Sequence, residues 1–505
     1  MSFGRREVDT GRHSGVLAHV SSLPTSQGIG TTGERARRFL RALADAGQHY
    51  WQMLPVGPTG YQDSPYQSPS THAGNPLLID LEDVVADSWL RPGELEPLHD
   101  LPRNRVDFGA LIPLKRQLLI SAATRFLRSG PGGEYEAFRQ TPWLDEFATF
   151  SALKQSYDDR PWVEWPTRLA LRNPAALRQA SDRLAEAIEV ERAIQFFFHR
   201  QWNALRSFAS QLGIELIGDL PIFVAHDSAD VWSRPDLFNL GEDGRPTTVA
   251  GVPPDYFSAT GQRWGNPLYR WDRHRDEGYG WWAARLAGAF ARFDLLRIDH
   301  FRGFSAYWEI PASEPTAING RWVEGPGADL FIKLAADQQL PIIAEDLGII
   351  TTEVTALRRQ FGFPGMRVAQ FGFDAESDTS LHHPQNYPTD VVAYTGTHDN
   401  DTAIGWFWGD NERHDRRRLN RDRRRLLQTT GTRGEEINWE MIQLVFDSKA
   451  ATAIVPVQDV LGLGSDARMN TPGKEEGNWT WRMPDDLPPR LVDRLARATL
   501  KSNRR

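Results

Sequence analysis

The 505-residue sequence contains no cysteine, which excludes disulfide bonds, thiolate metal sites and a cysteine nucleophile. It also lacks an apolar run long enough to cross a membrane, and no N-terminal segment resembles a signal peptide. We therefore expect a cytoplasmic protein that has no membrane partner.

An excess of positive charge is absent as well. The formal net charge is −8 and the isoelectric point is about 5.9, which argues against a nucleic acid as the main partner. Residues 413–425 are locally basic, but Asp415 and Asp422 interrupt the run, and we interpret it as a solvated helix face without a ligand. Tryptophan, in contrast, is abundant at 18 residues. Its rings can stack on the apolar faces of sugars, although burial is their commoner role.

Short apolar runs alternate with helical patterns along most of the chain. A strand at residues 15–20, a helix that stops at Gly47 and a strand at 49–54 form a βαβ unit, which favours a parallel sheet. Further strands are expected at residues 214–219, 293–299, 340–345, 366–371, 391–395 and 453–457. Eight strands with intervening helices predict an α/β protein built as a (β/α)8 TIM barrel. We expect residues 1–505 to form one such domain, without a separate C-terminal β-domain.

Two connections are much longer than a barrel needs. Residues 60–213, after the second strand, show helical periodicity and predict a largely helical insertion. Residues 225–278, after the third strand, are rich in Gly, Pro, Trp and Tyr and show little periodicity. We expect this second insertion to consist of ordered loops that cover the mouth of the barrel.

Charged side chains follow several of the expected strands, and the carboxyl ends of barrel strands face one cavity. Arg297 lies two residues before Asp299 and therefore on the same face of its strand, where its cation favours the ionised carboxylate. A structural Asp–Arg pair would explain this stretch alone. It does not explain a whole set of acids, since like charges in one cavity repel. The residues expected to meet are Asp219, Arg297, Asp299, Glu345, Asp346, His398 and Asp399.

Two chemistries compete for this cluster. In a glycosidase-type site, two carboxyl groups flank a glycosidic bond, one ionised and the other a proton donor with a raised pKa. In an enolase-type site, the acids bind Mg²⁺ and a Lys or His base abstracts a proton. No expected strand end carries a lysine, and Arg297 would compete with a metal ion for Asp299. The residues therefore favour the sugar chemistry.

An ordered set of motifs runs nearly from end to end of the chain. These motifs are Gly15-Val-Leu-Ala-His19, Ser22-Leu-Pro24, Gly28-Ile-Gly30, Asp63-Ser-Pro-Tyr-Gln67, Ala73-Gly-Asn-Pro76, Gly218-Asp-Leu-Pro-Ile-Phe-Val224, Gly261-Gln-Arg-Trp-Gly-Asn-Pro-Leu-Tyr269, Arg297-Ile-Asp-His-Phe-Arg-Gly303, Ala344-Glu-Asp-Leu-Gly348, Gly396-Thr-His-Asp-Asn400 and Arg468-Met-Asn-Thr-Pro-Gly473. In these motifs the chain resembles the 4-α-glucanotransferases of the amylomaltase type (disproportionating enzymes, glycoside hydrolase family 77).

The resemblance implies a role for each matching residue. Asp299 matches the family's nucleophile, Glu345 its general acid/base and Asp399 the carboxylate that stabilises the transition state. His398 has a second interpretation, in which it only orients Asp399, and Asp346 is expected to support the site rather than to catalyse. Substrate-binding positions are implied for Tyr61, Asp219, Gln262, Trp264, Arg297, His398 and Asn470.

The implied activity is a retaining transfer of α-1,4-glucan segments to the 4-hydroxyl of glucose or another glucan, through a covalent intermediate on Asp299. The retaining mechanism predicts a separation of about 5–5.5 Å between the carboxyl groups of Asp299 and Glu345. No metal or organic cofactor is expected, and the partners would be maltooligosaccharides, glycogen- or starch-type chains and glucose. The sequence is compatible with a monomer and determines no oligomeric state.

Two interpretations remain beside the transferase. One is an α-1,4-glucan hydrolase of the same clan, and the other is a glucan-binding protein without catalytic activity. The chain departs from the family pattern at His72, where an aromatic is frequent, and at Gln385, where a histidine is frequent. Both positions lie outside the catalytic acids, so these departures bear on acceptor preference rather than on the reaction.

Overall fold

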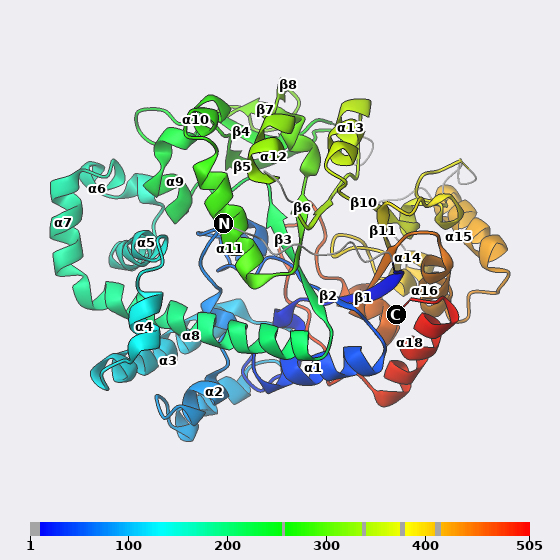
Figure 1. Cartoon of the computed structure of the whole chain (residues 1–505), viewed down its shortest axis with the longest axis horizontal. Helices are drawn as coiled ribbons and strands as arrows, with labels where there is room; N and C mark the ends of the chain where they lie inside the picture. Colours follow the sequence, from blue (N-terminus) through cyan, green and yellow to red (C-terminus); the bar gives the residue numbers. More distant parts are fainter. Residues whose placement is uncertain (1–10, 255–257, 336–339, 374–378, 410–415, 505) are drawn as a thin grey trace.

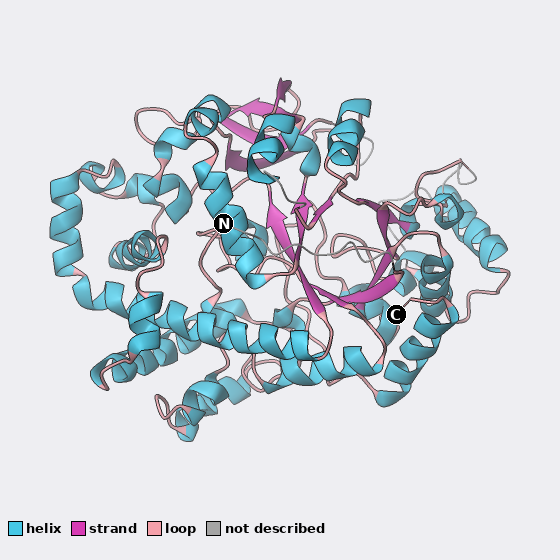
Figure 2. Ribbon diagram, viewed as in Figure 1, coloured by secondary structure: helices cyan, strands magenta, loops and turns pink. Residues whose placement is uncertain are grey.

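The fold is organised around a barrel of eight parallel strands (Figures 1 and 2). The computed structural model describes residues 11–254, 258–335, 340–373, 379–409 and 416–504. In spatial order the strands are β10 (Gly365–Val368), β11 (Val391–Tyr394), β12 (Thr452–Pro456), β1 (His13–Leu17), β2 (Tyr50–Gln52), β3 (Glu215–Pro221), β6 (Leu295–Asp299) and β9 (Ile342–Ala344). The sheet closes where the Ala344 N–H donates to the Pro364 carbonyl, 2.9 Å away. The predicted (β/α)8 barrel is therefore confirmed.

Helices surround the barrel and pack on its strands or on one another, as α11 does on β3 and β6 and α18 does on α1 and α16. Helix α1 buries Phe39, Leu40 and Leu43 and stops at Gly47, whose φ of +66° is the left-handed conformation that ends helices. The other helices around the barrel are α11 (Gly280–Arg292), α12 (Ala328–Ala335), α13 (Thr352–Gln360), α14 (Ala403–Trp408), α15 (Arg416–Thr430), α16 (Ile437–Asp447), α17 (Val457–Leu461) and α18 (Pro489–Lys501), besides α1 itself (Glu34–Asp45).

The connection between β2 and β3 is built from helices. The longest, α8, places Phe197, Trp202 and Leu205 in the core, and the Trp202 indole N–H donates to the Arg292 carbonyl at 3.1 Å, so the insertion is anchored to the barrel. Its helices are α2 (Leu81–Ala86), α3 (Phe108–Arg128), α4 (Gly133–Phe138), α5 (Leu144–Ser156), α6 (Thr167–Ala170), α7 (Pro174–Arg183) and α8 (Ala185–Gln211).

Residues 225–278 differ from the expected loops. They contain the helices α9 (Ala229–Ser233) and α10 (Trp271–Asp276) and two strands of a second, antiparallel sheet. This sheet has the order β5 (Gln262–Pro267), β4 (Thr248–Val252), β7 (Ala306–Pro311) and β8 (Arg321–Glu324), and it lies at the top of Figures 1 and 2. The prediction of loops alone was wrong because β4 and β5 are short and β4 pairs with β7, which follows only after β6 in the chain.

The C-terminal part of the chain adds no further sheet. After β12, the residues described up to Arg504 contain helices, turns and an isolated bridge from Trp481 to Arg105. Among the described helices, none combines the length and the hydropathy that a membrane crossing would need.

Candidate active site

Strand pairing brings Asp219, Arg297 and Asp299 together. Asp219 and Arg297 are register partners on the neighbouring strands β3 and β6. The Arg297 guanidinium donates to Asp219 Oδ2 at 2.6 Å and to Asp299 Oδ1 at 2.8 Å. Arg297 is only 4% exposed. The guanidinium thus lies between the two carboxylates and pairs with both.

Glu345 follows β9, the strand next to β6. Its Oε2 accepts the backbone N–H of His300 at 2.8 Å and its Oε1 accepts that of Leu347 at 2.7 Å. Burial, and then the charge of Asp299, raises the pKa of Glu345 to about 7 against the opposing effect of Arg297 and of these two hydrogen bonds. A carboxyl group with this pKa can give and take a proton near neutral pH.

Asp399 and His398 lie in the loop after β11. Asp399 Oδ1 accepts the side-chain N–H of Asn470 at 2.6 Å and lies 3.3 Å from His398 Nε2. The side chain of Asp399 is 43% exposed, unlike the buried Asp219. Arg468 donates to the backbone carbonyls of Asp399 and Asn470, so it ties the two segments together.

The tyrosine that reaches the acids is Tyr66. Its hydroxyl donates to Asp219 Oδ2 at 2.8 Å and lies 2.9 Å from His398 Nε2, and its ring stacks on that of His398 at 5.3 Å. Tyr61, the residue implied by the resemblance, is 73% exposed in a preceding turn. Tyr66 directly follows Pro65, which begins a 3-10 turn whose N-cap, Ser64, accepts the Tyr66 N–H. The structure therefore brings Tyr66 to the acids, and the substrate-binding role expected of Tyr61 stays a prediction.

The two residues expected from the insertion after β3 lie on β5. The Trp264 ring meets the His300 ring edge to face at 4.8 Å, and its indole N–H donates to Gln262 Oε1 at 3.2 Å. Trp264 is therefore next to the residue that follows Asp299, whereas Gln262 is exposed and touches the site through Trp264.

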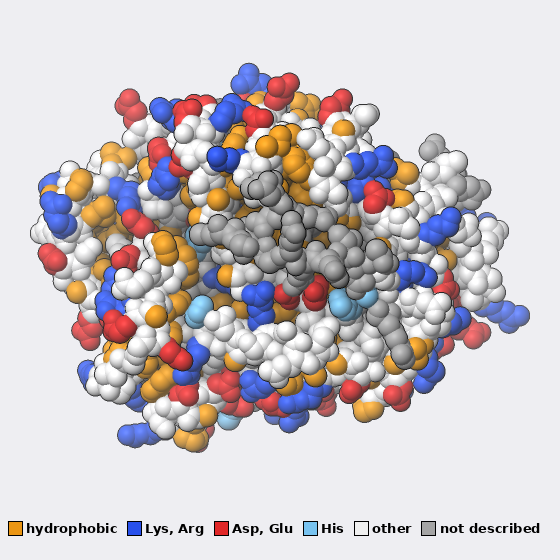
Figure 3. Space-filling model, viewed as in Figure 1, with side chains coloured by type: hydrophobic (Ala, Val, Ile, Leu, Met, Phe, Trp, Pro, Cys, Tyr) orange, Lys and Arg blue, Asp and Glu red, His pale blue; other side chains and the backbone are white. Residues whose placement is uncertain are grey.

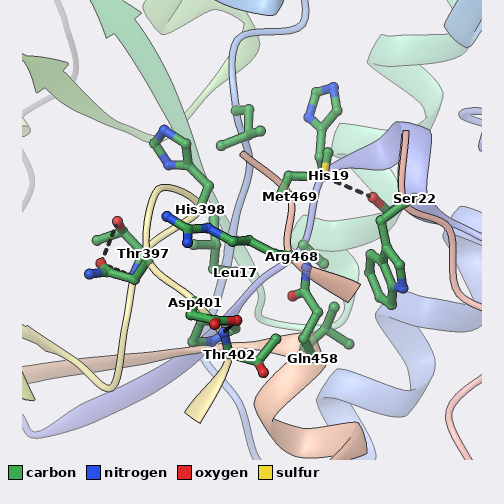
Figure 4. A pocket seen from close by; sticks show the side chains of 16 residues that line it. Leu17, His19, Ser22, Thr397, His398, Asp401, Thr402, Gln458, Arg468 and Met469 are labelled. Carbon is green, nitrogen blue, oxygen red and sulfur yellow. Dashed lines mark hydrogen bonds between the residues drawn. The ribbon is translucent and has the colours of Figure 1, made fainter. Parts of the chain in front are cut away.

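A small cavity of about 30 Å³ lies behind His398 (Figure 4). His19, Arg468 and Met469 are among its walls. Burial, and then the charge of His398, lowers the pKa of His19 to about 3, so its imidazole is neutral at ordinary pH. The cavity has room for about one water molecule, and the residues around it support the loop that carries His398.

Asp346 supports the site instead of entering it. Its Oδ1 accepts the Met366 N–H at 2.7 Å, and its carboxylate pairs with Arg358 and Arg367. It therefore joins β9 to β10. Within the residues that the structure describes, no three His, Asp or Glu side chains are arranged to hold a metal ion.

Figure 3 shows acidic, basic and histidine side chains gathered near the middle of one face of the molecule.

The comparisons with known proteins identify the family of this chain. The sequence profile of a glycoside hydrolase family described as 4-alpha-glucanotransferase matches residues 18–488. The chain belongs to this 4-alpha-glucanotransferase family. It is 50% identical to the 4-alpha-glucanotransferase of Thermus thermophilus, over 96% of this chain and 97% of the relative, and 44% identical to that of Synechocystis, over 98% of both.

A solved structure of the family has the same fold. The amylomaltase from Streptococcus agalactiae, in complex with acarbose, superposes with a TM-score of 0.93 and 36% identity, over 98% of this chain and 99% of that one. The resemblance read from the motifs is thereby confirmed, and the protein is an enzyme of the glucanotransferase type.

Sequence reasoning missed three residues of this glucanotransferase site. Tyr66 and Arg468 stand inside motifs that carried the resemblance, so a signal was present, but their contacts come from distant segments. His300 also stands in such a motif, next to Asp299, but the motif does not predict its contact with Trp264 on β5.

Proposed function

We propose that this enzyme moves a segment of an α-1,4-glucan to the 4-hydroxyl of glucose or of another α-1,4-glucan, with retained configuration. Maltooligosaccharides and glycogen- or starch-type chains are the proposed donors. The relative solved with acarbose supports a carbohydrate ligand. The cytoplasm is the proposed compartment, and no cofactor is part of the proposal.

In the first step Asp299 attacks the anomeric carbon and forms a β-glucosyl ester. Arg297 supports this role because it donates to the Asp299 carboxylate and keeps it oriented. The bond to the leaving oxygen breaks as protonated Glu345 gives its proton to that oxygen. The pKa of about 7 leaves a substantial protonated fraction of Glu345 at neutral pH.

In the second step the 4-hydroxyl of an acceptor glucan attacks the ester. Glu345, now ionised, takes the proton of that hydroxyl, a new α-1,4 bond forms and the Asp299 carboxylate is released. Asp399 would hold sugar hydroxyls at the reacting ring, with Asn470 fixing its carboxylate at 2.6 Å. Asp219, Tyr66 and His398 would complete the walls of that subsite.

One observation carries the proposal: two carboxyl groups on adjacent strands have opposite electrostatic surroundings. Asp299 is paired with a buried guanidinium, whereas the half-buried Glu345 has no cationic hydrogen-bond partner among the described residues and its pKa is raised. A nucleophile and a proton donor require this difference.

Transfer also needs water to be excluded from the ester. We propose that the helical insertion, residues 60–213, and residues 225–278 exclude it.

Incubation with maltotriose tests the proposal. A glucanotransferase gives glucose together with a ladder of maltooligosaccharides longer than maltotriose. A hydrolase gives only maltose and glucose, and that product set would overturn the proposal in favour of the hydrolase. A protein that only binds glucans gives no products, and then Asp299→Asn would change nothing that the assay measures. Chromatography of the products distinguishes the three outcomes.

A further inference from the structure

His300, the residue after Asp299, has an unusual backbone conformation. Its φ of 54° and ψ of 47° lie in the left-handed region, which few residues other than glycine adopt and which is often found at functional sites. Its N–H donates to Glu345 Oε2 at 2.8 Å. The backbone at His300 is thus tied to the carboxyl group that we propose as the acid/base.

The imidazole ring is held closely by its neighbours. Trp264 packs on it edge to face at 4.8 Å. A Cβ atom at Gly303 would lie 3.3 Å from His300 Cδ2 and 2.8 Å from Ile222 Cδ1, so only glycine at position 303 leaves the ring its place. The ring therefore has a defined position that does not depend on a bound sugar.

The ring also has an unused polar atom. Nε2 of His300 is buried and has no hydrogen-bond partner among the residues with described positions. Buried polar atoms in proteins nearly always have a partner, so an exception calls for an explanation such as a ligand. Burial lowers the pKa of His300 to about 4, so the ring is neutral at ordinary pH. A neutral imidazole suits a hydroxyl group, which can both donate and accept a hydrogen bond.

The position of the ring indicates which sugar it would meet. Arg297, Asp219, Tyr66 and His398 form a connected network, which we call the donor-side cluster. His300 and Trp264 are linked instead to Glu345. Glu345 exchanges its proton with the oxygen that joins the reacting ring to the leaving sugar, and later with the acceptor hydroxyl at the same place. A side chain held beside Glu345 and outside the donor-side cluster therefore faces the leaving sugar and its replacement.

We propose that His300 Nε2 hydrogen-bonds a hydroxyl of the leaving glucosyl unit and of the acceptor that replaces it, with Trp264 as the apolar wall beside that sugar. His300 is then a binding residue that selects a sugar acceptor over water. This inference rests on the proposed transferase function and adds to it the residue that recognises the acceptor.

The experiment separates the donor from the acceptor by using α-maltosyl fluoride, whose leaving group is not a sugar, with glucose as the acceptor. His300→Gly removes the ring but keeps the left-handed backbone and its N–H to Glu345. The KM of this variant for glucose as acceptor should rise about tenfold or more, the scale of one lost hydrogen bond. The ratio of hydrolysis products to transfer products should also increase. Fluoride release without acceptor should fall by much less. His300→Asn, which also tolerates the left-handed region and keeps a polar group, should lie between His300→Gly and the wild type.

Ser88→Gly is the matched control. Ser88 has the same left-handed backbone conformation, with a φ of 67°, but it is exposed and lies in the helical insertion, residues 60–213. It should leave the acceptor KM and fluoride release at wild-type values. An unchanged acceptor KM and transfer ratio in His300→Gly would overturn the inference, as would an equal loss of fluoride release and acceptor use, which indicates that the ring only supports Glu345. A wild-type enzyme that transfers to no acceptor at all would refute the proposed function instead.

Discussion

The two sides of Asp299 differ in how their polar atoms are satisfied. In the donor-side cluster, Arg297 bridges two carboxylates, and Tyr66 joins Asp219 to His398. On the Glu345 side, the carboxyl group accepts hydrogen bonds from two backbone N–H groups, and His300 Nε2 has no partner among the described residues. The proposed functions follow this difference: the charged network would hold the donor sugar in one orientation, whereas His300 Nε2 beside Trp264 would bind first the leaving chain and then the acceptor that replaces it.

The largest effect is expected where the two sides meet. Asp299→Ala should reduce maltotriose turnover by about four orders of magnitude or more, since a covalent mechanism loses its nucleophile. Rates measured by product chromatography check this. Asp45→Ala, at an exposed acid of α1, should retain most turnover, because Asp45 lies outside the site. A residual rate in Asp299→Ala above about one hundredth of the wild type would contradict the assigned role.

The next largest effect concerns the stability of the donor-side cluster. Arg297→Met should lower the free energy of unfolding by about 3–5 kcal/mol, because it leaves buried Asp219 and its neighbour Asp299 without their cation. Urea unfolding measures this change. The exposed pair of Arg35 with Asp486 is the matched control, and Arg35→Met should change the unfolding free energy by less than about 1 kcal/mol. Equal changes in the unfolding free energy of the two variants would show that the buried ion pairs of Arg297 contribute no more to stability than the exposed pair.

A smaller effect distinguishes the two tyrosines. Tyr66→Phe removes a hydroxyl that donates to Asp219 and contacts His398. The transition-state stabilisation calculated from kcat/KM for maltotriose should therefore decrease by about 1–3 kcal/mol. Tyr61→Phe, at 73% exposure, should change kcat/KM by about twofold or less. Steady-state kinetics of both variants provide the test. A greater loss in Tyr61→Phe would identify Tyr61, and not Tyr66, as the tyrosine that binds the reacting sugar.

The smallest effect is the dependence on pH. The pKa of Glu345 is raised from about 4.5 to about 7, so its protonated form, which the first step requires, is lost as the pH rises through 7. The plot of kcat/KM against pH should therefore fall on its basic side with an apparent pKa of about 7, that of Glu345. Activity that stays constant to about pH 9 would mean that Glu345 is not the proton donor.

Much of the fold and the site could be predicted because local patterns report burial. The apolar run before Asp299 predicts β6, and the two-residue spacing from Arg297 predicts the ion pair that is found. The predicted strands differ from the observed ones mainly at their ends, as with residues 15–20 against β1, His13–Leu17. Such ends depend on pairing with neighbours, which the local sequence does not contain.

By itself the sequence determined the barrel, the family and the strand-end acids, because alternation of apolar and polar residues and the order of motifs are local properties of the chain. Only the tertiary structure decided that Tyr66 rather than Tyr61 meets Asp219, that β4 and β5 join a second sheet, and that Trp264 lies on His300. These contacts join residues far apart in sequence, and their energy comes from packing and hydrogen bonds that exist only once the barrel has closed.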